Sequence, residues 1–304
     1  MSSDPAAEHA AQSAEPLAPK VTALIVSYNS ADALRRCVQS LRASEGRDLF
    51  EILVVDLGSR DESPQIDTEF DDITMLRLPK HFGATKAMNI ATRTAMGDYI
   101  FYLDPHVELK PDALVRLMRH LDGDDDASAV CPLLEEAGSG RPVPQAYRLP
   151  NRETLDAACK SGVVPLAAVN VGDGASPVPV EYHSRAALMV RKVFVQGMNY
   201  FDERYGHYWG DAELAWQIRK AGKKTLILPG ARASWYAPPP ESKSKALEAD
   251  RWVGASAFLR KHEGFGAGLG FLFGAALRAL FSFNFGLFTA LVSGQKVDGN
   301  QGPI

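Results

Sequence analysis

Short apolar runs alternate with amphipathic stretches along the first half of the chain. The apolar runs are rich in Val, Ile, Leu and aromatic residues and predict β-strands covered on both faces, because such strands lack polar alternation. These runs occupy 21–26, 51–55, 73–78 and 99–103. Amphipathic spacing predicts helices between them, over 31–44, 83–95 and 111–120. Strands that alternate with helices are typical of a parallel or mostly parallel sheet, so the pattern predicts an α/β fold.

The second half is less regular. Residues 135–180 are rich in Gly, Pro and Ala, and we expect them to be irregular. Beyond them the pattern predicts strands at 186–191 and 225–228 and helices at 212–221 and 245–262. We expect a disordered tail over 1–19, with no secretory signal because no basic start precedes an apolar run. We therefore divide the chain into this tail, an α/β domain at 20–240 and a C-terminal helical segment at 241–304.

Composition narrows the class of protein. The chain has 304 residues, of which 46% are hydrophobic and 23% charged, and its formal net charge is −4. A nucleic-acid-binding protein would show a basic excess, so we expect no nucleic-acid partner. The three cysteines (Cys37, Cys131 and Cys159) are scattered and form no zinc or disulfide pattern, which favours buried thiols.

Polar residues follow three of the predicted strands. Asn29, Asp56 and Asp104 each lie where a strand ends, and ligands of such sheets bind beyond the carboxyl ends of the strands. Asp56 can accept hydrogen bonds from the base or sugar of a nucleotide, and Gly58 lets the backbone approach closely. Taken alone, this stretch also fits an ordinary turn.

Asp104, Pro105 and His106 form a second candidate site. A carboxylate and an imidazole two residues apart in extended chain can reach one divalent cation, which would neutralise a diphosphate leaving group. A proline turn with an exposed histidine is the competing interpretation.

The second half supplies a candidate base. Asp211 precedes an amphipathic helix, where a carboxylate can accept a proton from an incoming hydroxyl or can cap the helix. Glu213 in the first turn suits the helix dipole. The segment 201–210 is dense in aromatic residues, which fits stacking on a sugar or packing in a core.

Other polar residues carry weaker signals. Lys80, His81 and Lys86 form a small basic cluster at a loop–helix junction, which fits either a phosphate site or a solvated loop. Four further histidines have no partner pattern, and we expect them at the surface: His9, His120, His183 and His262.

In order and spacing, these elements resemble family 2 glycosyltransferases of the GT-A fold, closest to the rhamnosyltransferase-like branch. The nucleotide half of the resemblance rests on 26–29 (Val-Ser-Tyr-Asn), 54–61 (Val-Val-Asp-Leu-Gly-Ser-Arg-Asp), 81–89 and 103–109. The acceptor half rests on 201–203 (Phe-Asp-Glu), Tyr208, 211–214 (Asp-Ala-Glu-Leu) and the following Ala221 and Gly222. The chain differs from the family pattern at Leu57, His106, Asn199, Tyr200, Gly210, Gln217 and Trp235.

The resemblance implies a Rossmann-like nucleotide-diphospho-sugar transferase fold and roles for particular residues. Asp211 would be the catalytic base of an inverting single displacement. Asp104 and His106 would hold a divalent cation, Mg²⁺ or Mn²⁺, although the motif ends in His rather than the usual Asp. The nucleotide-sugar contacts would come from Ser27, Asn29, Asp56, Gly58, Lys86 and Asp104. The acceptor side would include Asp202, Glu203, Tyr208 and Glu213.

The end of the chain is much more apolar than the rest. Residues 265–294 carry one charge, Arg278, in a segment rich in Phe, Leu, Ala and Gly. The length approaches the roughly 20 residues that a membrane span needs, but a central Arg disfavours a span and favours helices lying in the interface. A helical hairpin packed on the domain or on another subunit is the alternative.

These observations lead to two hypotheses. The first is a sugar transferase on the inner face of the cell membrane, in the cytoplasm, using a UDP- or dTDP-sugar and a glycan or lipid-linked acceptor of the cell surface. The second is a catalytically degenerate relative that serves as a binding or scaffold protein at the membrane. An oligomer is compatible with both.

Overall fold

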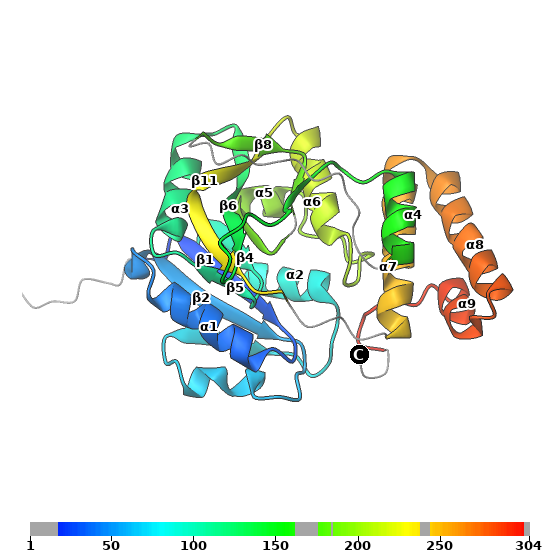
Figure 1. Ribbon diagram of the computed structural model, residues 1–304, viewed down its shortest axis with the longest axis horizontal. Helices are drawn as coiled ribbons and strands as arrows, with labels where there is room; N and C mark the ends of the chain where they lie inside the picture. The colour runs from blue at the N-terminus through cyan, green and yellow to red at the C-terminus, as the bar shows by residue number, and fades with distance from the viewer. Residues whose placement is uncertain (1–17, 162–175, 184, 238–243, 301–304) are drawn as a thin grey trace, which may run out of the picture.

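The computed structural model describes residues 18–161, 176–183, 185–237 and 244–300 (Figure 1). Most of the tail predicted over 1–19 lies outside them. The main sheet contains β1 (Val21–Ser27), β2 (Phe50–Asp56), β3 (Ile73–Arg77), β4 (Tyr99–Leu103), β5 (Val107–Leu109), β6 (Ala127–Glu136), β8 (Val178–Val180), β10 (Ala187–Arg191) and β11 (Lys224–Trp235). A second small sheet pairs β7 (Ala146–Tyr147) with β9 (Tyr182–His183).

The helices surround the main sheet and continue to one side of it. The α-helices are α1 (Ala31–Arg42), α2 (Ala84–Thr94), α3 (Ala113–Gly123), α4 (Arg152–Ser161), α5 (Lys192–Gly197), α6 (Gly210–Lys220), α7 (Lys245–His262), α8 (Phe265–Phe281) and α9 (Phe285–Val292). Two 3-10 helices, η1 (Arg47–Leu49) and η2 (Ser63–Thr68), lie in loops.

The main sheet is mixed, with the strand order β3-β2-β1-β4-β10-β6-β11-β5. β1 lies between β2 and β4, and these strands and β3 are parallel. β10 runs antiparallel between β4 and β6. The predicted α/β fold is confirmed, and its parallel half carries the strand ends singled out in the sequence.

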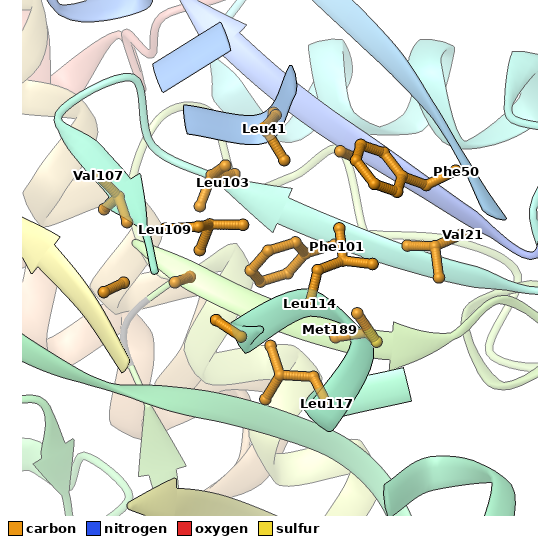
Figure 2. Packing of buried hydrophobic residues seen from close by; sticks show 14 of the residues in the cluster. Val21, Leu41, Phe50, Phe101, Leu103, Val107, Leu109, Leu114, Leu117 and Met189 are labelled. Atoms are coloured by element: carbon orange, nitrogen blue, oxygen red, sulfur yellow. The ribbon is translucent and has the colours of Figure 1, made fainter. Parts of the chain in front are cut away.

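Two apolar cores cover the faces of this sheet. Ile25 of β1 packs with α1 and α3, whereas its neighbour Leu24 packs with α2, because successive side chains of a strand point to opposite faces. Figure 2 shows Phe101 of β4 in the same cluster as Leu41 of α1 and Leu114 of α3. Burial on both faces explains why these strands are apolar throughout.

A third core joins helices beside the sheet, at the right of Figure 1. It brings α4, α6, α7, α8 and α9 together, and the rings of Trp252 and Phe271 lie 5.4 Å apart between α7 and α8. Arg278 of α8 donates to Asp156 of α4 at 2.7 Å, so the central charge of the apolar tail is paired. Within the described ranges, no helix is both long and apolar enough to cross a membrane.

Two elements correct the expectations for the middle of the chain. The stretch expected to be irregular contains α4, whose Leu155 and Ala158 are buried in the third core. The ten-residue strand β6 escaped the pattern analysis, which assigned no element to 127–134. Pro132 lies inside β6, and a proline in a run argues against a central strand.

Candidate active site

The carboxyl ends of three neighbouring strands form one wall of the candidate site. Ser27 at the end of β1 is in register with Asp56 at the end of β2, and the Leu57 N–H donates to the Ser27 carbonyl at 2.9 Å. On the other side of β1, Ile25 is in register with Leu103, the residue before Asp104. The sheet therefore brings Asp56 and Asp104 to the same edge.

Asp56 is a buried carboxylate with one unused oxygen. Its side chain is nearly inaccessible, since the residue is 1% exposed. Oδ2 accepts the N–H groups of Gly58 and Ser59, each at 3.0 Å, while Oδ1 has no hydrogen-bond partner among the described residues. Gly58 adopts a φ of 75°, and a Cβ there would lie 3.1 Å from the backbone of Lys80. The turn thus holds one oxygen of Asp56 and leaves the other for a donor.

Ser27 and Asn29 shape this wall through contacts within the protein. The Ser27 hydroxyl is buried and lies 2.9 Å from that of Ser30. Asn29 has a φ of 48°, donates its N–H to Ser59 and accepts the N–H of Arg60, both at 2.8 Å. These bonds fasten the loop after β2 to the end of β1.

The basic cluster expected at 80–86 is not a cluster of three charges. His81 is buried, and desolvation, aided by the charge of Arg185, lowers its pKa to about 4, so it is neutral at pH 7. Lys86 extends over the ring of Phe82, with Nζ 4.7 Å from the ring centre. The cluster as predicted is wrong at His81, while Lys86 stays a candidate contact.

Asp104 and His106 lie beside each other as the metal hypothesis requires. Asp104 Oδ1 accepts the backbone N–H of His106 at 2.8 Å and lies 2.9 Å from His106 Nδ1. Its side chain is 43% exposed. By their chemistry the two groups could offer one oxygen and one nitrogen ligand to a divalent cation.

Trp235 lies next to this pair. It is in register with Val107, and the following Tyr236 N–H donates to the His106 carbonyl at 2.9 Å. An indole has no lone pair to offer a metal. Across the described parts of the chain, no three His, Cys, Asp or Glu side chains gather as a metal site.

Asp211 lies in the first turn of α6 rather than at the cap, because the helix begins at Gly210 and Trp209 precedes it with a φ of 71°. Its Oδ2 accepts the hydroxyl of the buried Tyr182 at 2.9 Å. Burial, and then the charge of Asp211, raise the pKa of Tyr182 well above its usual value, so the phenol stays a donor. The interpretation as a helix cap is therefore wrong, whereas the catalytic role stays a prediction.

Gly210 replaces an acid of the family pattern for a steric reason. A Cβ at this position would lie 2.8 Å from Oγ1 of Thr85 in α2. The first residue of α6 thus lies close to Thr85 of α2, and any side chain at 210 would have to displace Thr85.

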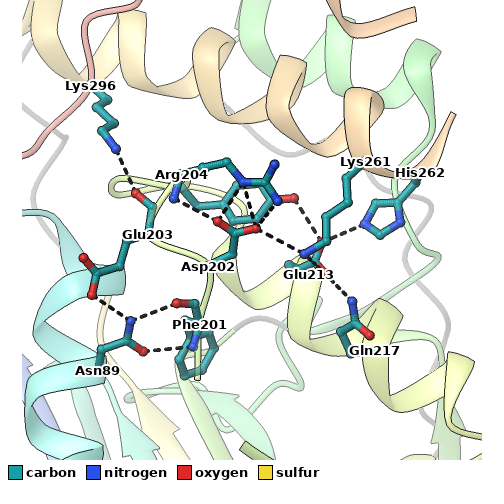
Figure 3. A network of polar contacts seen from close by, with 11 residues as sticks. Asn89, Phe201, Asp202, Glu203, Arg204, Glu213, Gln217, Lys261, His262 and Lys296 are labelled. Carbon is teal, nitrogen blue, oxygen red and sulfur yellow. Dashed lines mark hydrogen bonds and ion pairs between the residues drawn. The ribbon is translucent and has the colours of Figure 1, made fainter. Parts of the chain in front are cut away.

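Three of the expected acceptor residues, Asp202, Glu203 and Glu213, lie in a polar network (Figure 3). Asp202 accepts from Arg204 at 2.5 Å and from Lys261 at 3.2 Å. Burial opposes ionisation, but these bonds hold the pKa of Asp202 well below its usual value. Glu203 accepts from Asn89 at 3.2 Å.

Glu213, which the resemblance implies on the acceptor side, lies inside the protein. It is fully buried, and its Oε2 lies 2.7 Å from Nε2 of His262 and 3.0 Å from the Tyr205 hydroxyl. Oε1 accepts from Gln217 at 2.6 Å and Lys261 at 2.8 Å. This carboxylate joins α6 to α7.

The structure also places Tyr208 and two of the histidines that were expected at the surface. The Tyr208 hydroxyl accepts from Arg251 at 2.9 Å. His183 is 2% exposed and the His262 side chain 6%, so the surface positions predicted for both are wrong. His9 lies outside the described residues.

Arg185 is a candidate that the sequence pattern did not reveal. It lies two residues before β10, and its guanidinium donates to the His207 carbonyl at 3.1 Å. A basic residue at the start of a strand that pairs with β4 is the signal that points to it, but only once the pairing is known.

Comparison with known proteins agrees with this geometry. Residues 22–168 match the model of the family described as glycosyl transferase family 2. The chain contains a glycosyltransferase domain of this family. Its fold is GT-A: the structure of GalNAc-T7 with UDP, GalNAc and Mn²⁺ superposes with a TM-score of 0.63 at 17% identity, over 79% of this chain and 48% of that one.

Two curated relatives extend the comparison. The succinoglycan biosynthesis protein ExoO of Rhizobium meliloti is 33% identical over 34% of this chain and 30% of its own. The N-acetylglucosaminyl-diphospho-decaprenol L-rhamnosyltransferase of Mycobacterium tuberculosis is 25% identical over 68% of this chain and 72% of its own. The glycosyltransferase domain spans about a third of the length of ExoO and of EpsH of Bacillus subtilis.

Proposed function

We propose that the chain is an inverting glycosyltransferase that moves a sugar from a UDP- or dTDP-sugar to a hydroxyl of a lipid-linked or cell-surface polysaccharide acceptor. The observation that carries this proposal is the buried Asp56 with its unused Oδ1, at the same sheet edge as Asp104. A carboxylate oxygen held in this way suits a donor on a nucleobase or ribose. The similarity to a succinoglycan biosynthesis protein and to a rhamnosyltransferase supports an acceptor of the polysaccharide class.

Asp211 is the proposed base. It takes the proton of the acceptor hydroxyl, whose oxygen then bonds to the anomeric carbon on the side opposite the nucleotide. The bond between that carbon and the diphosphate oxygen breaks, and its electron pair leaves with the nucleoside diphosphate. Tyr182 donates to Asp211 Oδ2 and keeps the carboxylate oriented.

Asp104 and His106 are the residues that would hold a divalent cation. Such an ion supplies positive charge to the departing diphosphate. His106 donates its backbone N–H to Asp104 Oδ1, which fixes the direction of that carboxylate. The carboxylate is thereby held in place at the strand end, on the side where the diphosphate is proposed to bind.

The C-terminal helices are proposed to rest on an anionic lipid surface. Large apolar side chains of α8, α9 and their connection are exposed: Phe265, Leu269, Phe273, Phe281, Phe283, Phe285 and Val292. Neither helix contains an acidic residue. Cations flank them, since Arg260 lies 5.7 Å from the Phe265 ring and Lys245 lies against Gly286. An apolar face beside basic residues favours anionic headgroups.

Donor binding and transfer test the proposal together. Thermal shift with UDP, dTDP and their sugars, with Mg²⁺ or Mn²⁺, should show stabilisation by one nucleotide series in the wild type and loss of it in Asp56→Asn. Asp211→Asn should retain that stabilisation while transfer to a lipid-linked acceptor falls about 10²- to 10⁴-fold. The matched control is Asp125→Asn, a fully exposed acid just before the start of β6.

The outcomes separate the two hypotheses. Near-normal transfer by Asp211→Asn would refute the assignment of the base. Trp235 beside the Asp104–His106 pair favours the second candidate, a degenerate binding protein. If the protein binds nucleotides but neither transfers sugar nor hydrolyses the donor with any added metal ion, that candidate is supported. Turnover of a nucleotide sugar would exclude it.

The membrane contact has its own test. Wild-type protein should sediment with vesicles that contain phosphatidylglycerol, and Phe265→Glu with Phe273→Glu should stay in the supernatant. If the wild type stays in the supernatant and the double variant changes its oligomeric state instead, the apolar face joins copies of the chain.

A further inference from the structure

Arg185 lies at the point where the two halves of the candidate site meet. The next residue, Ala186, accepts the backbone N–H of Asp104 at 2.8 Å. Arg185 itself donates from Nη1 to the carbonyl of His207, in the loop that leads to α6. The guanidinium therefore touches the loop 198–209, called the acceptor loop below, while the backbone of Arg185 runs beside the strand end that carries Asp104.

Unlike many arginines of the chain, Arg185 forms no ion pair with a described residue. Arg35, Arg47 and Arg77 each pair with carboxylates at 2.5 to 2.9 Å. In the described structure, Arg185 is partly buried and meets no carboxylate, and its bond to His207 is its one hydrogen bond. A guanidinium has five N–H donors, so four remain for a ligand.

The positive charge of Arg185 affects the pKa values of three neighbouring side chains. It contributes, after burial, to lowering the pKa of His81 and of His207, and it acts on the phenol of Tyr182 that binds Asp211. Both imidazoles are neutral at pH 7. Among these four groups Arg185 alone carries a positive charge.

We propose that Arg185 binds the diphosphate of the nucleotide donor and stabilises the negative charge that develops on it as the sugar leaves. This inference rests on the proposed function. A planar guanidinium binds phosphate oxygens in a bidentate way, and a fixed donor aimed at developing charge lowers the barrier. Arg185 keeps its proton throughout; it donates hydrogen bonds while the electron pair of the broken bond moves to the diphosphate oxygen.

The arrangement also bears on the substitution at Trp235. Trp235 is in register with Val107, the residue after His106, and its indole offers no metal ligand. Arg185 lies two residues before β10, the strand that pairs with β4 and whose neighbour Ala186 bonds Asp104. In the proposed complex the permanent charge of Arg185 would add to that of a cation for which Asp104 and His106 offer only two ligands.

Binding of diphosphates and of nucleosides to the same variants tests the inference. The probes are UDP and dTDP by calorimetry in Mg²⁺, and uridine and thymidine by NMR titration. Arg185→Gln should lower the affinity for the diphosphate that binds the wild type about 10- to 100-fold, and it should leave the affinity for the nucleoside unchanged. Arg185→Lys should restore part of the loss, because it keeps the charge without the fork.

A matched control separates binding from support of the fold. Arg191 is at the far end of β10 and donates to the carbonyls of Leu121, Asp124 and Ala127. Arg191→Gln should lower the melting temperature and leave the affinity for UDP or dTDP unchanged.

Each outcome has one meaning. Failure of the wild type to bind either diphosphate would overturn the proposed function. Wild-type binding with equal affinity in Arg185→Gln would overturn the inference and leave the function standing. An equal loss for diphosphate and nucleoside in Arg185→Gln would also overturn it, since it would show that Arg185 only holds the acceptor loop.

Discussion

Replacing His81 by asparagine should remove much of the acid sensitivity of the fold. His81 is 8% exposed, and its Nδ1 accepts the N–H of Gly83 at 3.2 Å, so a proton on Nδ1 would face another donor. Burial, and the charge of Arg185, lower its pKa to about 4. Asparagine at this position keeps the turn, because its side-chain oxygen can accept the N–H two residues on.

The direction and size of this effect on stability follow from the difference between the pKa of His81 in the folded and in the unfolded chain. Between its ordinary pKa of 6.5 and the folded value of about 4, His81 binds a proton in the unfolded chain but not in the folded one. Its contribution to stability is therefore complete above pH 6.5 and falls as the pH drops, by about 1.4 kcal/mol per pH unit. At pH 4.5 the loss reaches about 2.5 kcal/mol. His207, whose pKa burial also lowers, acts in the same direction.

Urea unfolding at pH 7.5, 6.5, 5.5 and 4.5 measures this effect. The free energy of unfolding of the His81→Asn variant should fall by about 2.5 kcal/mol less than that of the wild type over this range. His120→Asn, on α3 across the sheet, controls for the loss of a histidine elsewhere. The reasoning is refuted if His81→Asn and wild type lose stability equally between pH 6.5 and 4.5.

Three further predictions concern contacts that hold the site. Asp250→Ala removes the acceptor of three buried backbone N–H groups and should cost about 3 to 5 kcal/mol in urea unfolding, whereas a cost below about 1 kcal/mol would contradict its role. Gly210→Glu should lower the melting temperature, because the new side chain meets Thr85; an unchanged melting temperature would show that α2 and α6 can separate. Glu213→Ala removes the shared hydrogen-bond partner of the buried Tyr205 and His262 side chains and should cost about 3 to 5 kcal/mol in the same unfolding assay, and a neutral result would argue against the network.

The predictable part of the fold is the part whose burial shows in local sequence. β1, β2 and β4 are buried on both faces, and their uninterrupted apolar runs identify them. β6 is equally buried but contains Pro132, and α4 follows a segment rich in Gly and Pro. α4 depends on partners far along the chain, since Leu155 packs in the core built by α7. No local pattern records such a partner.

The same limit applies to the site. Asp56 and Asp104 are found from sequence because the ends of parallel strands meet at one edge. The resemblance implies an acceptor-side role for Glu213, but the sequence does not show that the residue is buried, because its hydrogen bond to His262 spans 49 residues. Arg185 stands out only because it meets no carboxylate in the described structure. Sequence spacing does not contain this information.

The contacts of Asp250 connect the apolar helices to the acceptor loop. Asp250 lies in α7, which packs on α8 and α9, and accepts the N–H groups of His207 and Tyr208 at 2.8 and 3.1 Å. It also accepts the N–H of Val297, beyond α9, at 2.8 Å. His207 in turn receives the hydrogen bond from Arg185. A lipid surface that holds α8 and α9 would therefore also fix the direction in which the acceptor loop and Arg185 face, which suits an acceptor that is itself anchored in that surface.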